Sequence, residues 1–65
     1  MESYQQRVVD EKSSLDENLR KLESFFSTDT YRSLPDEEKH WLSCQEEAMS
    51  RYSFCLGKRI ANFKP

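Results

Sequence analysis

The sequence predicts an all-α fold, an antiparallel two-helix hairpin that assembles into a helical homo-oligomer. Two segments carry apolar residues at alternating steps of three and four residues, the pattern of a helix with one buried face. A short polar segment joins them, and a short connection leaves two helices antiparallel. A chain of 65 residues buries little apolar surface by itself, so we expect further copies to complete the core.

The first helix is expected over about residues 2–27 of a single domain, residues 1–65. This segment contains neither glycine nor proline, and its apolar stripe consists of Val8, Leu15, Leu19, Leu22 and Phe26. The same spacing places Lys12 on the stripe, between Val8 and Leu15. The buried face of the first helix therefore has one charged member.

The connection is expected at about residues 28–33, and the second helix over about residues 34–63. Ser33 can cap that helix by accepting a backbone hydrogen bond, and Pro35 fits a first turn, where its missing N–H costs nothing. Acidic residues follow, and the positive end of the helix dipole favours them: Asp36, Glu37 and Glu38. The closed end of the hairpin is expected to be filled by Phe25, Phe26, Tyr31, Leu34 and Trp41.

The second stripe repeats every seven residues, at Leu42, Met49, Leu56 and Phe63. Tyr52 is expected to fill the intermediate step between Met49 and Leu56, and the corresponding steps on either side fall on Gln45 and Arg59. Gly57 has two interpretations. It is either a weak point of the helix, costing about 1 kcal/mol relative to alanine, or a place where a backbone or a ligand approaches closely.

Charge and composition argue against several classes of protein. The net charge of −2 argues against general binding of duplex nucleic acid, which requires a basic face. No apolar run approaches the roughly 20 residues that span a bilayer, so we expect a cytoplasmic protein without a membrane segment. Cys44 and Cys55 lie too far apart on one helix for a disulfide, and a single histidine, His40, makes a metal site unexpected.

Neither catalysis nor a cofactor is expected. The sequence contains no glycine-rich phosphate loop and no GxSxG motif. His40 lies four residues before Cys44, so a nucleophile–base pair on one helix face is conceivable. We interpret the pair instead as a half-exposed histidine beside a small core cysteine.

Positive side chains on the two apolar stripes, Lys12 and Arg59, need something to neutralise them. In one interpretation, Lys12 extends to water and Arg59 pairs with Glu11 or with an acid of another subunit. In the other, they belong to an anion site, because basic side chains bind phosphate and a tyrosine ring can stack on a base. The residues expected toward the open end of the hairpin for this site are Tyr4, Arg7, Lys12, Tyr52, Lys58 and Arg59.

Two runs of the sequence resemble a family of very small phage proteins. One run is Tyr4-Gln5-Gln6-Arg7-Val8-Val9-Asp10-Glu11-Lys12, followed by Leu15, Leu19 and Leu22. The other comprises Ala48-Met49, Tyr52, Leu56-Gly57-Lys58-Arg59-Ile60 and Phe63. They are similar to the helical-hairpin domain of phage anti-defence sponges that block CBASS or Thoeris immunity. The resemblance extends over nearly the whole chain.

This resemblance implies a compact helical oligomer, commonly a hexamer, in the cytoplasm of an infected bacterial host cell. It implies binding of cyclic dinucleotides or trinucleotides, or of cyclic ADP-ribose-type signals, without cleavage. It also implies that Tyr4 stacks on a base, that Lys12 meets phosphate and that Arg59 matches a basic position of the last helix. Because Tyr4 and Lys12 are closer together than their counterparts in such sponges, Arg20 or Lys21 remains an alternative to Lys12.

Two other functions are compatible with the residues. A small phage protein of this kind could inhibit a host protein by direct binding through a helix face, with Tyr31, Trp41 and Phe54 as candidate contacts. A purely structural hairpin would bind neither a ligand nor a partner.

Overall fold

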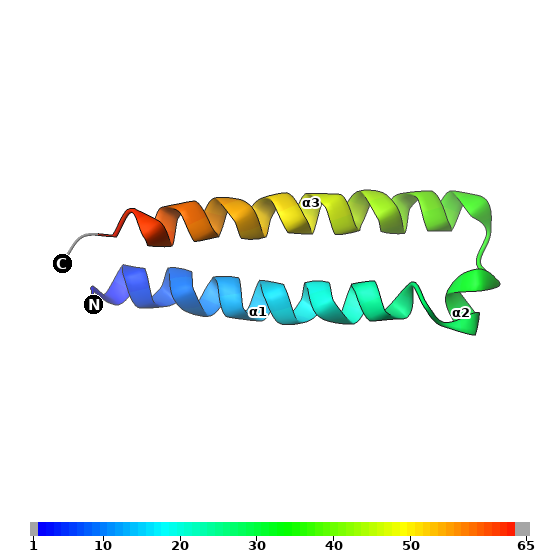
Figure 1. Ribbon diagram of the computed structural model, residues 1–65, viewed down its shortest axis with the longest axis horizontal. Helices are drawn as coiled ribbons and strands as arrows, with labels where there is room; N and C mark the ends of the chain where they lie inside the picture. The colour runs from blue at the N-terminus through cyan, green and yellow to red at the C-terminus, as the bar shows by residue number, and fades with distance from the viewer. Residues whose placement is uncertain (1, 64–65) are drawn as a thin grey trace.

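Two long helices and one short helix make up the computed structural model, which describes residues 2–63 (Figure 1). The helices are α1 (Ser3–Phe25), α2 (Asp29–Arg32) and α3 (Asp36–Ala61). α1 and α3 lie side by side and antiparallel, and α2 forms the bend between them, which gives a rod of 49 × 15 × 13 Å. The all-α prediction is confirmed. Met1, Lys64 and Pro65 of the predicted domain lie outside the described residues.

Polar side chains start the first two helices. The backbone N–H of Glu2 donates to Gln5 Oε1 at 2.9 Å, which satisfies an otherwise unpaired amide and accounts for the burial of Gln5. At the start of α2, Thr28 Oγ1 accepts a hydrogen bond from the Tyr31 N–H at 3.1 Å. The Thr28 hydroxyl also donates to the Phe25 carbonyl at 2.7 Å, so this one side chain joins the end of α1 to the start of α2.

The connection differs from the turn predicted over residues 28–33, because most of it forms α2. Ser33 does not cap α3, since its hydroxyl donates to the Thr30 carbonyl at 2.8 Å and ends α2. α3 begins one residue after Pro35, which occupies the N-cap in extended backbone (φ −61°, ψ 152°). Proline disfavours helical backbone at the residue before it, so Leu34 separates the two helices. The three acids fill the first turn of α3 as expected.

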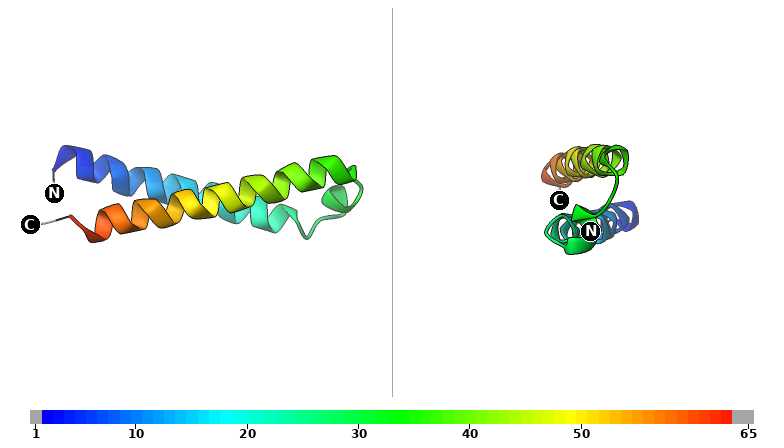
Figure 2. Two further views of the ribbon diagram at one scale, coloured as in Figure 1. Left: turned by 90° about the horizontal axis from the view of Figure 1, so that it is seen from above. Right: turned by 90° about the vertical axis from the view of Figure 1, so that its right-hand side faces the viewer.

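A seam of buried and half-buried side chains joins the two long helices, which cross at a shallow angle when seen from above (Figure 2). From α1 it contains Gln5, Val8, Lys12, Leu15, Leu19 and Leu22, and from α3 Leu42, Glu46, Met49, Ser53, Leu56 and Ile60. Phe26 and Phe63, just beyond the ends of these helices, extend it. Among the described residues, only Val8 and Leu56 are buried apolar side chains, with 5% and 1% of their surface exposed. The apolar positions predicted for both stripes therefore lie on the seam, but the core they form is thin.

The intermediate steps of the α3 stripe fall one residue later than predicted. Glu46, Ser53 and Ile60 occupy them, whereas Gln45, Tyr52 and Arg59 are exposed. Ser53 is 9% exposed and Tyr52 45%. The physical reason is that the facing part of α1 carries Lys12 and Asp16, and the Ser53 hydroxyl accepts a hydrogen bond from the first and donates one to the second.

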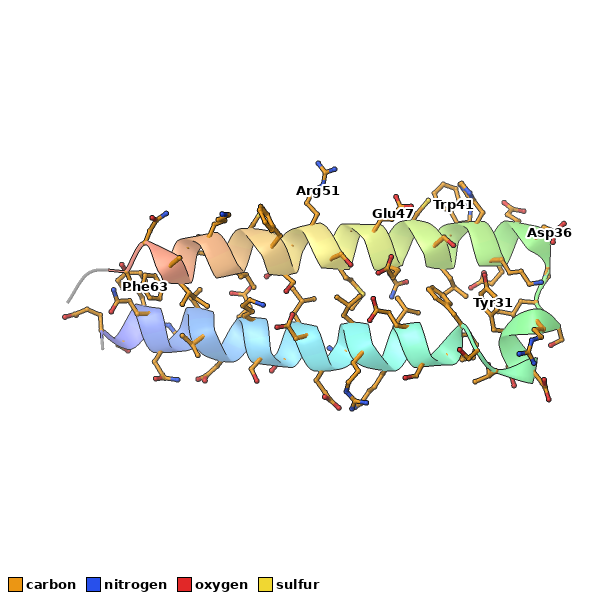
Figure 3. The ribbon with its side chains drawn as sticks, in the orientation of Figure 1. Tyr31, Asp36, Trp41, Glu47, Arg51 and Phe63 are labelled. Carbon is orange, nitrogen blue, oxygen red and sulfur yellow. The ribbon has the colours of Figure 1, made fainter. Side chains whose placement is uncertain are left out.

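Aromatic side chains fill the closed end of the hairpin. The Tyr31 ring packs edge-on against Phe25, with 6.0 Å between the ring centroids, and tilted against Phe26 at 5.1 Å. Trp41 was predicted to join them and does not. It is 59% exposed, and its ring lies against the His40 ring with 4.9 Å between the centroids. Figure 3 shows Trp41 pointing away from α1, whereas Tyr31 points between the helices. None of the helices described here is long and apolar enough to cross a membrane.

Candidate functional site

A groove lies between α1 and α3 in the half of the hairpin that is open. It has a volume of about 340 Å³ and is lined by Lys12 from α1 and by Ser53, Phe54, Gly57, Lys58 and Ala61 from α3. The groove combines two cationic side chains, a hydroxyl and an aromatic ring. Lys12 and Lys58 are the members of the predicted site that it brings together.

Lys12 is held by a triangle of hydrogen bonds on one side of this groove. Its ammonium donates to Asp16 Oδ2 at 2.7 Å and to Ser53 Oγ at 3.0 Å, and the Ser53 hydroxyl donates to Asp16 Oδ1. The bonds from Lys12 and, next, from Ser53 hold the pKa of the Asp16 carboxyl below its ordinary value. The charge of Lys12 is therefore compensated within the chain, by an acid that the sequence interpretation had not paired with it.

Gly57 makes room for the stem of Lys12. A Cβ atom at this position would lie 3.3 Å from Lys12 Cε, which is closer than most such contacts in proteins. The sequence interpretation expected a backbone or a ligand close to this glycine, whereas the group that approaches it is a side chain of α1. A Cβ atom here would require the stem of Lys12 to shift by a few tenths of an ångström.

Lys58 and Phe54 form the other side of the groove. The Lys58 ammonium lies over the Phe54 ring, 5.2 Å from its centroid, and the ring is 65% exposed. Within residues 2–63, Lys58 makes no ion pair with a carboxylate. An ammonium available to an anion thus stands beside an aromatic face available for stacking, the two contacts that a nucleotide uses.

The other predicted site residues lie elsewhere on the surface. Positions 52 and 59 flank the buried row of α3 on the side opposite Gly57, so Tyr52 and Arg59 share the second edge of the hairpin. Tyr4 lies at the open end, edge-on to Phe63 with 5.9 Å between centroids, and Arg7 is exposed on α1. The predicted set is therefore divided among the two edges, the open end and α1.

The sequence interpretation missed two residues that organise the groove, Asp16 and Ser53. Signals for both exist. Asp16 follows Lys12 by four residues, the spacing of an ion pair along one helix face, and Ser53 occupies an intermediate step once the stripe of α3 is placed in the correct phase. Phe54 had been considered only as a contact for a protein partner.

A larger hollow, about 710 Å³, lies wholly on α3 and does not suit an anion. It is lined by Glu46, Glu47, Ser50, Arg51, Phe54 and Cys55, so acids outnumber bases. Glu46 accepts a hydrogen bond from the Ser50 hydroxyl at 2.9 Å. The neighbouring Glu46 carboxyl, together with desolvation, raises the pKa of Glu23. Phosphate would be repelled from this surface.

His40 and Cys44 approach each other on α3, with 3.7 Å between Nε2 and Sγ. His40 is exposed and Cys44 half-buried. Within the part of the chain that the structure describes, no group of three or more histidine, cysteine, aspartate or glutamate side chains could hold a metal ion.

Comparison with known proteins gives one family. A family model described as Sequestin matches residues 2–62, which include both long helices, the connection and the whole groove. Comparisons with curated proteins and with solved structures found no match.

Proposed function

Because the chain belongs to the Sequestin family, whose name indicates a sequestering function, we propose that it is a phage anti-defence sponge. In this proposal it binds cyclic oligonucleotide immune signals, or cyclic ADP-ribose-type signals, in the cytoplasm of the infected bacterial cell and does not cleave them. The family match over residues 2–62 carries the proposal. The groove between α1 and α3 supplies the place where such a ligand would bind.

The roles of the groove residues follow from their partners. Lys58 meets a phosphate, because its ammonium has no carboxylate partner among the described residues. The exposed ring of Phe54 stacks on a base. Lys12 contributes less charge than its position suggests, since Asp16 already accepts from it and would repel phosphate.

The size of the groove bears on assembly. A volume of about 340 Å³ is at the low end of ligand sites, which range over about 300–1,000 Å³, and suits a single nucleotide unit. A cyclic dinucleotide or trinucleotide therefore needs grooves from more than one copy. This is consistent with a homo-oligomer, and a hexamer is the state favoured by the resemblance.

Sequestration acts by stoichiometry. Each bound signal molecule is withheld from the host effector, so the protein must be at least as abundant as its ligand and bind it with a dissociation constant below the ligand concentration. No reacting group is required. The ligand leaves the protein unchanged when the protein unfolds.

Retention of intact ligand tests this proposal. Native mass spectrometry of protein purified from cells with an active signalling system is expected to show a bound cyclic nucleotide, and chromatography after denaturation to recover it unchanged. Titration calorimetry then measures the binding of cyclic dinucleotides, cyclic trinucleotides and cyclic ADP-ribose species to the purified protein. Absence of binding to every one of them would contradict the proposal, and recovery of a linear product would indicate an enzyme.

The Lys58→Glu variant tests whether the ligand binds in the groove. We expect at least a tenfold loss of affinity with an unchanged far-UV circular dichroism spectrum, because this side chain is exposed. Lys21→Glu, on the polar outer surface of α1, makes the same change of charge and serves as the matched control. If Lys21→Glu alone abolishes binding, the phosphate site lies at Arg20 and Lys21 instead.

A second candidate function is inhibition of a host protein through a helix face. The observation that favours it is the exposure of large apolar side chains on α3, 59% for Trp41 and 65% for Phe54. Affinity purification from host lysate would then recover one protein in stoichiometric amount, and Trp41→Ala would abolish its recovery.

A further inference from the structure

The side of α3 that faces away from α1 is rich in apolar residues, whereas the corresponding side of α1 is polar. We refer to it as the outer face of α3. Its apolar members are Trp41, Cys44, Ala48 and Cys55, and Phe54 and Ala61 lie at its border with the groove. Figure 3 shows Trp41, Glu47 and Arg51 pointing away from α1. The outer side of α1 instead carries Gln6, Asp10, Ser13, Ser14, Glu17, Arg20, Lys21 and Ser24. One long helix is thus apolar on two sides and the other on one.

Charge on the outer face of α3 is separated along its length. Acids occupy its first half, at Glu37 and Glu47, and bases its second half, at Arg51 and Lys58. Such a face complements a second copy of itself when the two copies run antiparallel, because each acidic half then meets a basic half. In a parallel arrangement like charges would be opposed.

We propose that the outer face of α3 docks against the same face of a second copy, antiparallel, around a two-fold axis between Ala48 and Arg51. In this register Cys44 faces Cys55 of the partner subunit and Trp41 faces Lys58 of the partner subunit. Glu47 lies one residue from the position directly opposite Arg51 of the partner subunit, within reach of its side chain. The proposal rests on the self-association included in the proposed function, and it does not depend on nucleotide binding.

The surface of the single chain supports this arrangement. It exposes 5045 Å², compared with about 4,400 Å² expected for a folded monomer of 7.8 kDa. The hollow of about 710 Å³ lies at the centre of the outer face, between Glu47, Arg51, Phe54 and Cys55, where side chains of a second helix would fill it. From Trp41 to Lys58 the contact would extend over about 26 Å of helix.

The two cysteines allow a direct test of orientation, because both lie on α3 and neither is in a disulfide. With a short bismaleimide, the antiparallel arrangement predicts crosslinked dimers of the native chain through Cys44 and Cys55. Cys44→Ser and Cys55→Ser should each form no crosslink alone, and an equimolar mixture of the two variants should form a crosslinked heterodimer. If each single variant crosslinks by itself, the helices are parallel and the proposal is wrong.

Charge exchange tests the register. Glu47→Lys and Arg51→Glu should each raise the dissociation constant of the dimer roughly tenfold, since either change opposes like charges at two symmetric places. The double variant should restore the native value. Glu47 and Arg51 do not line the groove, but Phe54 and Lys58 belong both to the groove and to this face, so nucleotide binding per chain is measured alongside association. Glu17→Lys, on the outer side of α1, is the matched control and should leave association unchanged.

Sedimentation velocity separates the remaining outcomes. A monomer at all concentrations would overturn both self-association and this interface. An oligomer whose mixed cysteine variants do not crosslink would overturn the interface alone, and would assign the outer face of α3 to another occupant such as a host protein.

Discussion

Lys12 is the residue on which the open half of the hairpin depends. Its ammonium bonds to Asp16 and Ser53, and its stem lies against Gly57. A polar layer of this kind costs stability compared with apolar packing, but it selects one register. Sliding α3 by one heptad would bring Ile60 or Glu46 to the place of Ser53. Ile60 offers no side-chain hydrogen bond, and Glu46 would place a second carboxylate beside Asp16.

The space above Gly57 gives the first prediction. Gly57→Ala should gain about 1 kcal/mol of helix propensity, but in the native chain part of this gain is lost because the new methyl group crowds Lys12. In a Lys12→Ala background the full gain should appear. Urea unfolding of the native chain, the two single variants and the double variant measures the coupling free energy between positions 12 and 57. Equal gains in both backgrounds would show that the contact between the new methyl group and Lys12 has no energetic effect.

The lowered pKa of Asp16 gives a pH dependence. Its contribution to stability is present above the ordinary pKa of 3.8 and is lost as the pH falls through the lower folded-state pKa. Lys12→Met removes the largest cause of the shift, so the melting temperature of this variant should fall less steeply below pH 3.8 than that of the native chain. Parallel slopes would mean that Lys12 does not stabilise the Asp16 carboxylate.

The pH dependence of stability expected from Glu23 has the opposite sign to that expected from Asp16. Its pKa is raised by Glu46, so its favourable contribution is complete below pH 4.5 and is lost as the pH rises through the raised value. At neutral pH the two carboxylates repel each other. Glu23→Gln should therefore raise the melting temperature at neutral pH and have little effect below pH 4.5. An equal change of melting temperature at neutral pH and below pH 4.5 would exclude repulsion between the carboxylates as the cause.

At the scale of the elements, α2 depends on a single capping side chain. Thr28→Ala removes the acceptor for the Tyr31 N–H and the donor to the Phe25 carbonyl, and should cost about 1 kcal/mol. Thermal unfolding followed by circular dichroism measures this loss. Thr30→Ala, in the same helix but without a side-chain hydrogen bond among the described contacts, is the control and should change stability much less.

The sequence predicted those parts of the elements that apolar periodicity determines. Leu42, Met49, Leu56 and Phe63 repeat every seven residues, and no other pattern competes with them. The intermediate steps were misplaced because they carry Glu46 and Ser53, and a polar residue on a seam looks like a surface residue until its partner is known. The α2 helix was missed for a related reason: its start depends on a hydrogen bond, and apolar spacing does not report it.

The candidate site was predictable to a smaller extent. The need to neutralise Lys12 follows from its place on the stripe, but the identity of its partner depends on which residues of α3 face it. Tyr52 and Arg59 were assigned to the same side as Lys12 because the phase of the stripe was off by one residue. An error of one position on a helix rotates a side chain by about 100° and so changes the edge on which it lies.

On the scale of the whole molecule, a rod with a thin core should owe much of its stability to association. The melting temperature is expected to rise with protein concentration, since unfolding then includes dissociation. Trp41, the single tryptophan, should shift its emission to shorter wavelength over the same range as it becomes covered. A melting temperature independent of concentration, with unchanged emission, would indicate that the hairpin is stable as a monomer.

The hydrogen-bonded triangle of Lys12, Asp16 and Ser53 affects which helices can pair with α1. A hairpin joined by leucines alone would exchange partners with other amphipathic helices. A foreign helix that offers a leucine in place of Ser53 would leave Lys12 and Asp16 without the hydrogen bonds that Ser53 makes to them. The polar layer therefore makes pairing of α1 with a foreign helix less favourable than pairing with α3.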